Sequence, residues 1–196
     1  MSRQIAYQLR KLLHFSPPLR NLMAGTALSD NLTYLHQAGS LVGSLTKASY
    51  TNTNPPLYNN GVGPHLRHCM DHYELFTSGW SLGIVDYDQR PRREKQQQDL
   101  FAMQTWISDQ SEALKCITGD DFNKTLKVKM DCGSEMDDPW STSSVLRELQ
   151  FLISHTVHHF ALIAMILRDQ NLSIPEGFGM APSTLKYEAE QTACAQ

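Results

Sequence analysis

Apolar residues recur every three or four positions over residues 147–164, which is the spacing of one face of an α-helix. Residues four apart on a helix lie almost above one another, so this segment carries one continuous stripe. The stripe consists of Glu148, Phe151, Leu152, His155, His159, Leu162 and Ile166. A lone histidine on such a face is usually a core residue. Two histidines four residues apart on the stripe, however, need a shared explanation. His158 lies about 100° round the helix from His159 and is expected at the edge of the stripe.

The same period predicts three further helices along the chain. The first is expected to be capped by Ser29 or Asp30, and a loop rich in Thr, Asn and Pro follows it over residues 49–61. Pro64 is well suited to the first position of the next helix, and the third helix covers about residues 94–117. Four helices with short or moderate connections predict an all-α fold, a four-helix bundle.

One segment departs from the helical period. Residues 126–132 alternate apolar and polar side chains, and the Gly-Ser pair at 133–134 can turn the chain back, so we expect at most a small β-hairpin before the last long helix. The expected organisation is a basic N-terminal arm over 1–28, the bundle over 29–170 and a C-terminal tail over 171–196 that packs on the bundle.

Composition narrows the class of protein. The 196 residues are 41% hydrophobic and 19% charged with a net charge of -3, so the chain is expected to fold and nothing indicates a nucleic-acid partner. The four cysteines are widely spaced, which indicates a reducing, cytoplasmic compartment. No apolar run suggests a transmembrane segment.

The N-terminal arm is basic, with no acidic residue before Asp30. We expect it to form a helix docked on the body; a surface-binding arm or an organelle-targeting presequence is the alternative. A second basic stretch lies in the connector over residues 85–93. Arg90 or Arg92 there could hold an anionic or amide ligand, but a solvated loop with local ion pairs is favoured.

The predicted second helix has its own histidines, His65, His68 and His72, at positions i, i+3 and i+7. Alone they would indicate a solvated face. With His155 and His159 on a facing helix they favour a three-nitrogen metal site, since bundles build such sites from facing helices. Imidazole suits zinc, nickel, iron or copper.

Three protein ligands leave a coordination position open for water or substrate, and a bound water or thiol becomes a nucleophile near neutral pH. His68 lies mid-helix, with His65 and His72 as neighbours that orient it or face the substrate. Glu148 either orients a metal-binding imidazole by accepting a hydrogen bond from its ring N–H, or it pairs with an arginine.

The segments over 66–74 and 155–159 resemble the DinB-like family of metal-binding four-helix bundles. The resemblance covers roughly residues 30–170. It implies ligands at His68, from an L-x-H segment, and at His155 and His159, from an HxxxH pair. Family members include thiol transferases and isomerases that use low-molecular-weight thiols, and many of unknown activity. Members often continue with Arg-Gly-Gln where this chain has residues 160–162, Phe-Ala-Leu, so no particular thiol chemistry is implied.

Three hypotheses follow. The leading one is a metal-dependent enzyme that activates water or a thiol for hydrolysis or thiol transfer on a small molecule, with zinc or nickel favoured over iron; no residue is assigned a catalytic role beyond the ligands. The second is a non-catalytic, metal-stabilised or metal-sensing module, whose site a fourth ligand would close. The third is a plain bundle with histidines in its core. A homodimer is compatible with all three.

Overall fold

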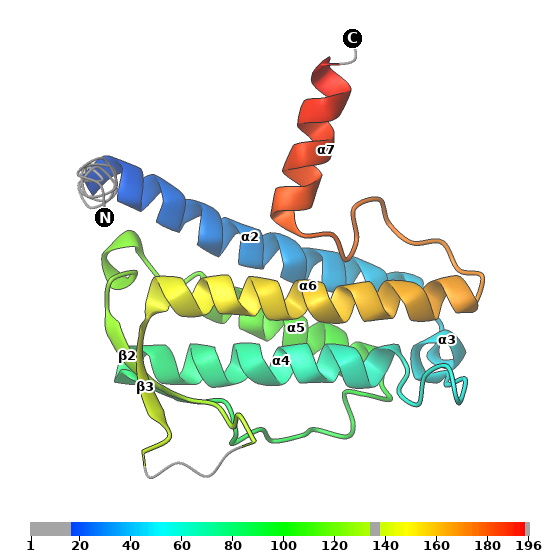
Figure 1. The fold of residues 1–196 in the computed structure, drawn as a ribbon. Helices are drawn as coiled ribbons and strands as arrows, with labels where there is room; N and C mark the ends of the chain where they lie inside the picture. Colours follow the sequence, from blue (N-terminus) through cyan, green and yellow to red (C-terminus); the bar gives the residue numbers. More distant parts are fainter. Residues whose placement is uncertain (1–16, 134–137, 195–196) are drawn as a thin grey trace.

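The computed structural model describes residues 17–133 and 138–194. Within them the chain is mostly helical, with a small three-stranded sheet at one end. Four helices pack side by side: α2 (Pro17–Ser44), α4 (Val62–Gly79), α5 (Leu100–Leu114) and α6 (Val145–Asp169) (Figure 1). Each of α2 and α4 contacts both α5 and α6, so one core is shared by all four.

The sheet has one more strand than the sequence predicts. β2 (Thr125–Lys129) pairs antiparallel with β3 (Trp140–Ser144), and it also pairs in parallel with β1 (Ile84–Asp86). β1 was missed because three residues are too short to show a period of two. Gly79 permits the turn into this strand, since a Cβ there would lie 2.2 Å from the carbonyl oxygen of Ile84.

The first long helix begins earlier than predicted. It already includes Pro17, the first described residue, and it continues past Ser29 and Asp30 to Ser44. Neither predicted residue therefore acts as a cap. Ser29 is exposed, and a polar residue on the solvent face is tolerated inside a helix. The expected boundary between arm and bundle falls within α2, while residues 1–16 lie outside the described part of the chain.

Shorter elements complete the fold. A short helix, α3 (Lys47–Thr51), overlaps the first residues of the expected loop over 49–61. Two 3₁₀ turns follow the longer helices: η1 (Trp80–Leu82) follows α4, and η2 (Gly119–Asp121) follows α5. The third predicted helix is shorter than expected, because α5 begins only after its N-cap, Asp99.

The last long helix begins at Val145, two residues before the predicted segment, and the side chain of its N-cap Ser144 accepts a hydrogen bond from the backbone N–H of Arg147. Helix α6 is long and apolar enough to cross a membrane, but the core helix of a soluble protein can have the same length and composition. In this structure 44% of the most apolar stretch of α6 is buried within the protein. The tail first packs on the body, where Phe178 stacks on Phe160 at 4.4 Å between ring centroids. Helix α7 (Pro182–Cys194) then projects away (Figure 1).

A buried polar network joins three of the helices. The Asn31 side chain of α2 donates to the carbonyl oxygen of Leu149 on α6 at 2.9 Å. Tyr73 of α4 donates to the Asn31 side-chain oxygen at 2.8 Å, and Thr156 of α6 donates to the Tyr73 hydroxyl at 3.4 Å. These bonds fix the position of α4 relative to α6 along the helix axes. A shift would break them, and the side chains involved are buried, so solvent could not supply replacement hydrogen bonds.

We predict that Asn31→Ala lowers the free energy of unfolding by about 2 kcal/mol, because it leaves the buried Tyr73 hydroxyl without its acceptor. Urea denaturation checks this. Thr33→Ala, on the exposed side of the same helix, is the control and should change stability by less than about 0.5 kcal/mol. Equal effects of the two substitutions would contradict the role of the network.

Candidate metal centre

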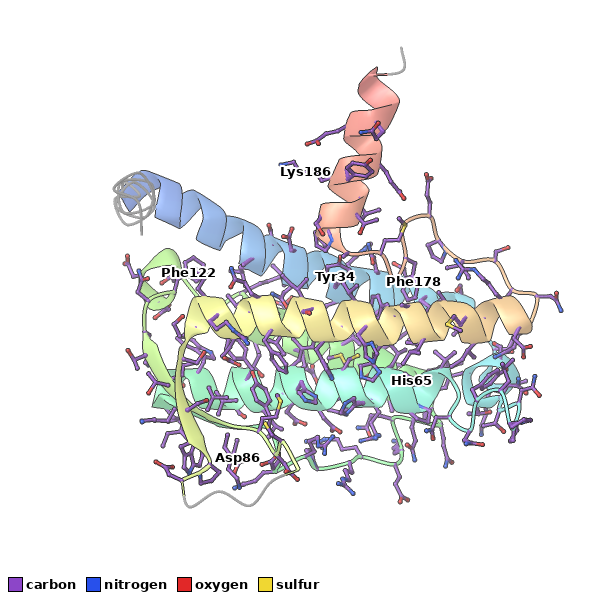
Figure 2. The ribbon with its side chains drawn as sticks, in the orientation of Figure 1. Tyr34, His65, Asp86, Phe122, Phe178 and Lys186 are labelled. Atoms are coloured by element: carbon purple, nitrogen blue, oxygen red, sulfur yellow. The ribbon has the colours of Figure 1, made fainter. Side chains whose placement is uncertain are left out.

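Histidines from α4 and α6 meet along the seam between these helices, where Figure 2 labels His65. They sit beside the buried apolar side of α4, which consists of Leu66, Cys69, Met70 and Tyr73. The helical spacing places three imidazoles of α4, at positions 65, 68 and 72, and two of α6, at positions 155 and 159, along the seam. His72 is the most buried of them, with 5% of its surface exposed. His158 is exposed, at the rim that the sequence predicts.

The centre of this cluster is formed by His68 and His155, whose Nε2 atoms lie 3.2 Å apart. Two nitrogen ligands of one tetrahedral zinc ion, each about 2.05 Å from the metal, are separated by about 3.3 Å. The observed separation matches a shared ion, and it equally matches a hydrogen bond between two neutral rings. His72 completes a group of three whose ligand atoms all lie within 4.8 Å of one another.

The third member of the group is held in a form suited to metal binding. His72 Nδ1 lies 2.9 Å from the backbone carbonyl oxygen of His68. A carbonyl oxygen only accepts hydrogen bonds, so Nδ1 carries the proton and Nε2 keeps its lone pair. Metal-binding histidines are commonly oriented by such a bond.

The predicted ligand His159 lies beside this group and has a different nearest partner. Its ring centroid is 4.7 Å from those of His68 and His155. Its Nδ1, however, lies 3.1 Å from Nδ1 of His65. The structure thus brings His68 and His155 together as expected, and it places both His72 and His159 where either could supply a third nitrogen. The set of His68, His155 and His159 stays a prediction.

Burial keeps the imidazoles neutral. Burial, and after it the charges of nearby imidazoles, lower the pKa of His68 to about 3 and that of His155 to about 2. The pKa of His159 falls to about 4, through burial and then through His65. Burial also lowers the pKa values of His65 and His72. Near pH 7 the rings are therefore in the neutral form that metals bind.

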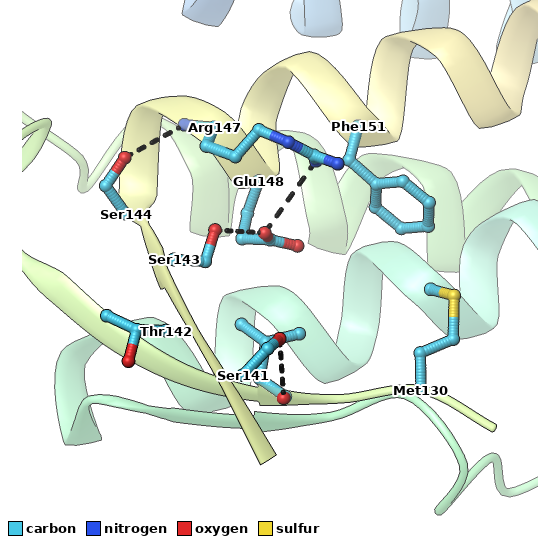
Figure 3. A pocket seen from close by; sticks show the side chains of 9 residues that line it. Met130, Ser141, Thr142, Ser143, Ser144, Arg147, Glu148 and Phe151 are labelled. Carbon is cyan, nitrogen blue, oxygen red and sulfur yellow. Dashed lines mark hydrogen bonds and ion pairs between the residues drawn. The ribbon is translucent and has the colours of Figure 1, made fainter. Parts of the chain in front are cut away.

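Aromatic side chains enclose one side of the cluster. The ring of Tyr87 stacks on His72 at 5.3 Å, and Phe151 stacks on His155 at 5.7 Å. Glu148 does not orient an imidazole directly, because its carboxylate accepts from Tyr87 at 3.0 Å and from Ser143. The alternative prediction, pairing with an arginine, matches the 3.8 Å contact to Arg147 (Figure 3).

Two cavities flank the histidines. The larger, about 410 Å³, lies between the sheet and the start of α6 (Figure 3). It is lined by Val128, Met130, Ser141, Thr142, Ser143, Ser144, Arg147, Glu148 and Phe151. Phe151 contacts both this cavity and the cluster. The smaller cavity, about 130 Å³, lies at the opposite end of the histidine row, where His65 meets Leu57 and Met165.

Sequence reasoning missed two residues that touch the cluster, Tyr87 and Arg90. Arg90 Nη1 lies 3.2 Å from Nδ1 of His68. Both residues belong to the connector over 85–93, which has no helical period to assign them to a face. The charged side chain of Arg90 was the one sequence feature that could have indicated a role. From sequence it suggests a ligand for an anionic or amide group and not a partner of a histidine.

Comparison with known proteins does not assign a family. No family model matches the chain. A similar protein is FK506-binding protein 5 of Rhizopus delemar, which is 28% identical over 119 residues. The matched part is 60% of this chain and 31% of that protein, so the chain spans less than a third of its relative's length. The binding of FK506 that the name describes belongs to that protein.

We predict that the metal-free protein loses stability as the pH falls below about 6.5, the ordinary pKa of a histidine. The folded-state values are lowered, so the unfolded chain takes up protons that the cluster excludes. The free energy of unfolding is therefore greatest above pH 6.5 and falls toward pH 4. Each histidine of the cluster contributes at most about 1.4 kcal/mol to this fall for each pH unit. Urea denaturation at pH 7.5, 6 and 5, with a chelator present, measures this decline.

His155→Gln removes one of these neutral rings and should make the decline shallower. His36→Gln, on the exposed face of α2, is the matched control and should leave it unchanged. A decline as steep in His155→Gln as in the parent protein would contradict the assignment to the cluster.

Proposed function

We propose that this chain is a DinB-like helical bundle that binds one divalent metal ion between α4 and α6. The ligands are His68, His155 and a third histidine, either His159 or His72. Zinc or nickel suits this all-nitrogen set, and iron is a further candidate. The observation that carries the proposal is the 3.2 Å separation of the Nε2 atoms of His68 and His155, beside further neutral imidazoles.

We further propose that the site is catalytic and acts on a small molecule. A metal ion held by three nitrogens would lower the pKa of a bound water or thiol, which then attacks an electrophilic substrate in hydrolysis or thiol transfer. The residues of the chain supply neutral imidazole ligands and shield part of the site from water. Phe151 and Tyr87 exclude water on one side, while the opposite end of the row, at His65 and the exposed His158, is accessible to a substrate.

The alternative is a closed, non-catalytic site, and one observation favours it. His72 has its Nε2 lone pair free and lies within the cluster, so it could join His68, His155 and His159 as a fourth ligand. Four protein ligands are typical of structural zinc, and such a site would stabilise the bundle or sense metal.

The metal content of the purified, untagged protein tests the site. We expect about one equivalent in the parent and none in His68→Ala or His155→Ala, while the exposed His36→Ala, as the control, retains it. In the open, catalytic site only one of His72→Ala and His159→Ala loses the metal; in the closed site both do. Protein that stays metal-free after incubation with zinc, nickel and iron would overturn the proposal.

We also predict that a chelator lowers the melting temperature of the metal-loaded protein. A ligand present at 100 to 1,000 times its dissociation constant stabilises the folded state by about 3–4 kcal/mol. For a domain of this size such a loss lowers the melting temperature by roughly 10 °C. Differential scanning calorimetry with and without EDTA measures the change, and the His68→Ala variant should show none. A shift of equal size in that variant would indicate that the chelator acts elsewhere.

A further inference from the structure

The contact between Arg90 and His68 fixes which nitrogens of two histidines carry protons. A guanidinium only donates hydrogen bonds, so His68 Nδ1, which lies 3.2 Å from Arg90 Nη1, must accept. The single proton of the neutral ring is then on Nε2, which donates to Nε2 of His155 at 3.2 Å. His155 accordingly carries its own proton on Nδ1. That atom is buried and has no hydrogen-bond partner in the described part of the chain.

This arrangement opposes metal binding at His68. To share a metal ion, His68 and His155 must both present the lone pair of Nε2, which requires the proton of His68 to move to Nδ1. Nδ1–H would then face a guanidinium N–H at hydrogen-bond distance, with no acceptor between the two donors. The contact between Arg90 and His68 and a metal ion on His68 Nε2 therefore exclude one another.

We propose that Arg90 competes with the metal for His68 and thereby sets the metal affinity of the site, an inference that rests on the proposed metal site. In the metal-free protein Arg90 holds His68 in the wrong tautomer. Metal binding expels the guanidinium, so Arg90 acts as a positioning residue through His68 and is not a ligand.

The expelled guanidinium has an acceptor nearby. Asp71 lies about one turn along α4 from His68, and its Oδ1 is buried with no hydrogen-bond partner among the described residues. Its other oxygen, Oδ2, is bound by Arg67 at 2.6 Å. Arg90 Nε is also buried and has no hydrogen-bond partner within residues 17–133 and 138–194. Burial raises the pKa of Asp71, and Arg90 is close enough for its charge to oppose that rise. Movement of the Arg90 side chain to Asp71 would pair both atoms and leave His68 free to bind metal.

Zinc titration of the metal-free protein by calorimetry, with a competing chelator, tests the inference. Arg90→Met removes the donor and should bind zinc roughly tenfold more tightly than the parent, as expected for loss of one charged hydrogen bond that opposes binding. Arg92→Met is the matched control, because it removes the same charge from an exposed position of the same connector. It should bind zinc within about twofold of the parent if the short contact, rather than general charge, is responsible.

Nitrogen-15 NMR of the metal-free protein gives a second readout, which does not require metal. We expect the Nε2–H form of His68 and the Nδ1–H form of His155 in the parent and in Arg92→Met, and a shift of His68 toward Nδ1–H in Arg90→Met. Equal zinc affinities of Arg90→Met and Arg92→Met, or a parent His68 already in the Nδ1–H form, would overturn the role of Arg90. Absence of zinc binding in every variant would instead overturn the metal site itself.

Discussion

The register of α4 against α6 is the constraint on which the rest of the structure depends. Tyr73 and Thr156 form a buried hydrogen bond across the two helices, and each immediately follows a histidine of the cluster, His72 and His155. A shift of one helix by a single residue would break this bond and move the imidazoles apart by 1.5 Å along the axis, as well as turning them away from one another. Asn31 holds the same register from α2. The network that stabilises the fold therefore also aligns the site.

The cluster weakens the fold that holds it. Neutral imidazoles are buried there although water would solvate them better, and folding excludes the protons that they would otherwise bind below pH 6.5. Buried polar atoms without partners also gather around it: Nδ1 of His155, Nε of Arg90 and Oδ1 of Asp71. Native proteins leave few such atoms, and each of them costs stability because it loses hydrogen bonds to water without gaining one in the fold.

Much of this organisation could be predicted from sequence, and the reasons are local. The period of 3.6 identifies α4 and α6, and histidines at i and i+4 must share a face. The part of α2 before Ser29 was missed because Ser29 offers a cap signal that the continuing helix does not use. β1 was missed because it owes its existence to pairing with β2, forty residues away along the chain.

The choice of third ligand could not be predicted, because spacing fixes where a Cα lies and not how a ring turns. His72 and His159 are both one turn from the central pair of His68 and His155. Only the bond from His72 Nδ1 to a backbone carbonyl shows that its Nε2 is free, whereas His159 has its Nδ1 against His65. By the same reasoning His68, the histidine that the sequence places at the centre, is the one whose tautomer opposes metal binding. The sequence therefore indicates which face carries the imidazoles, while the proton positions depend on a contact from Arg90, in a connector that has no periodic pattern.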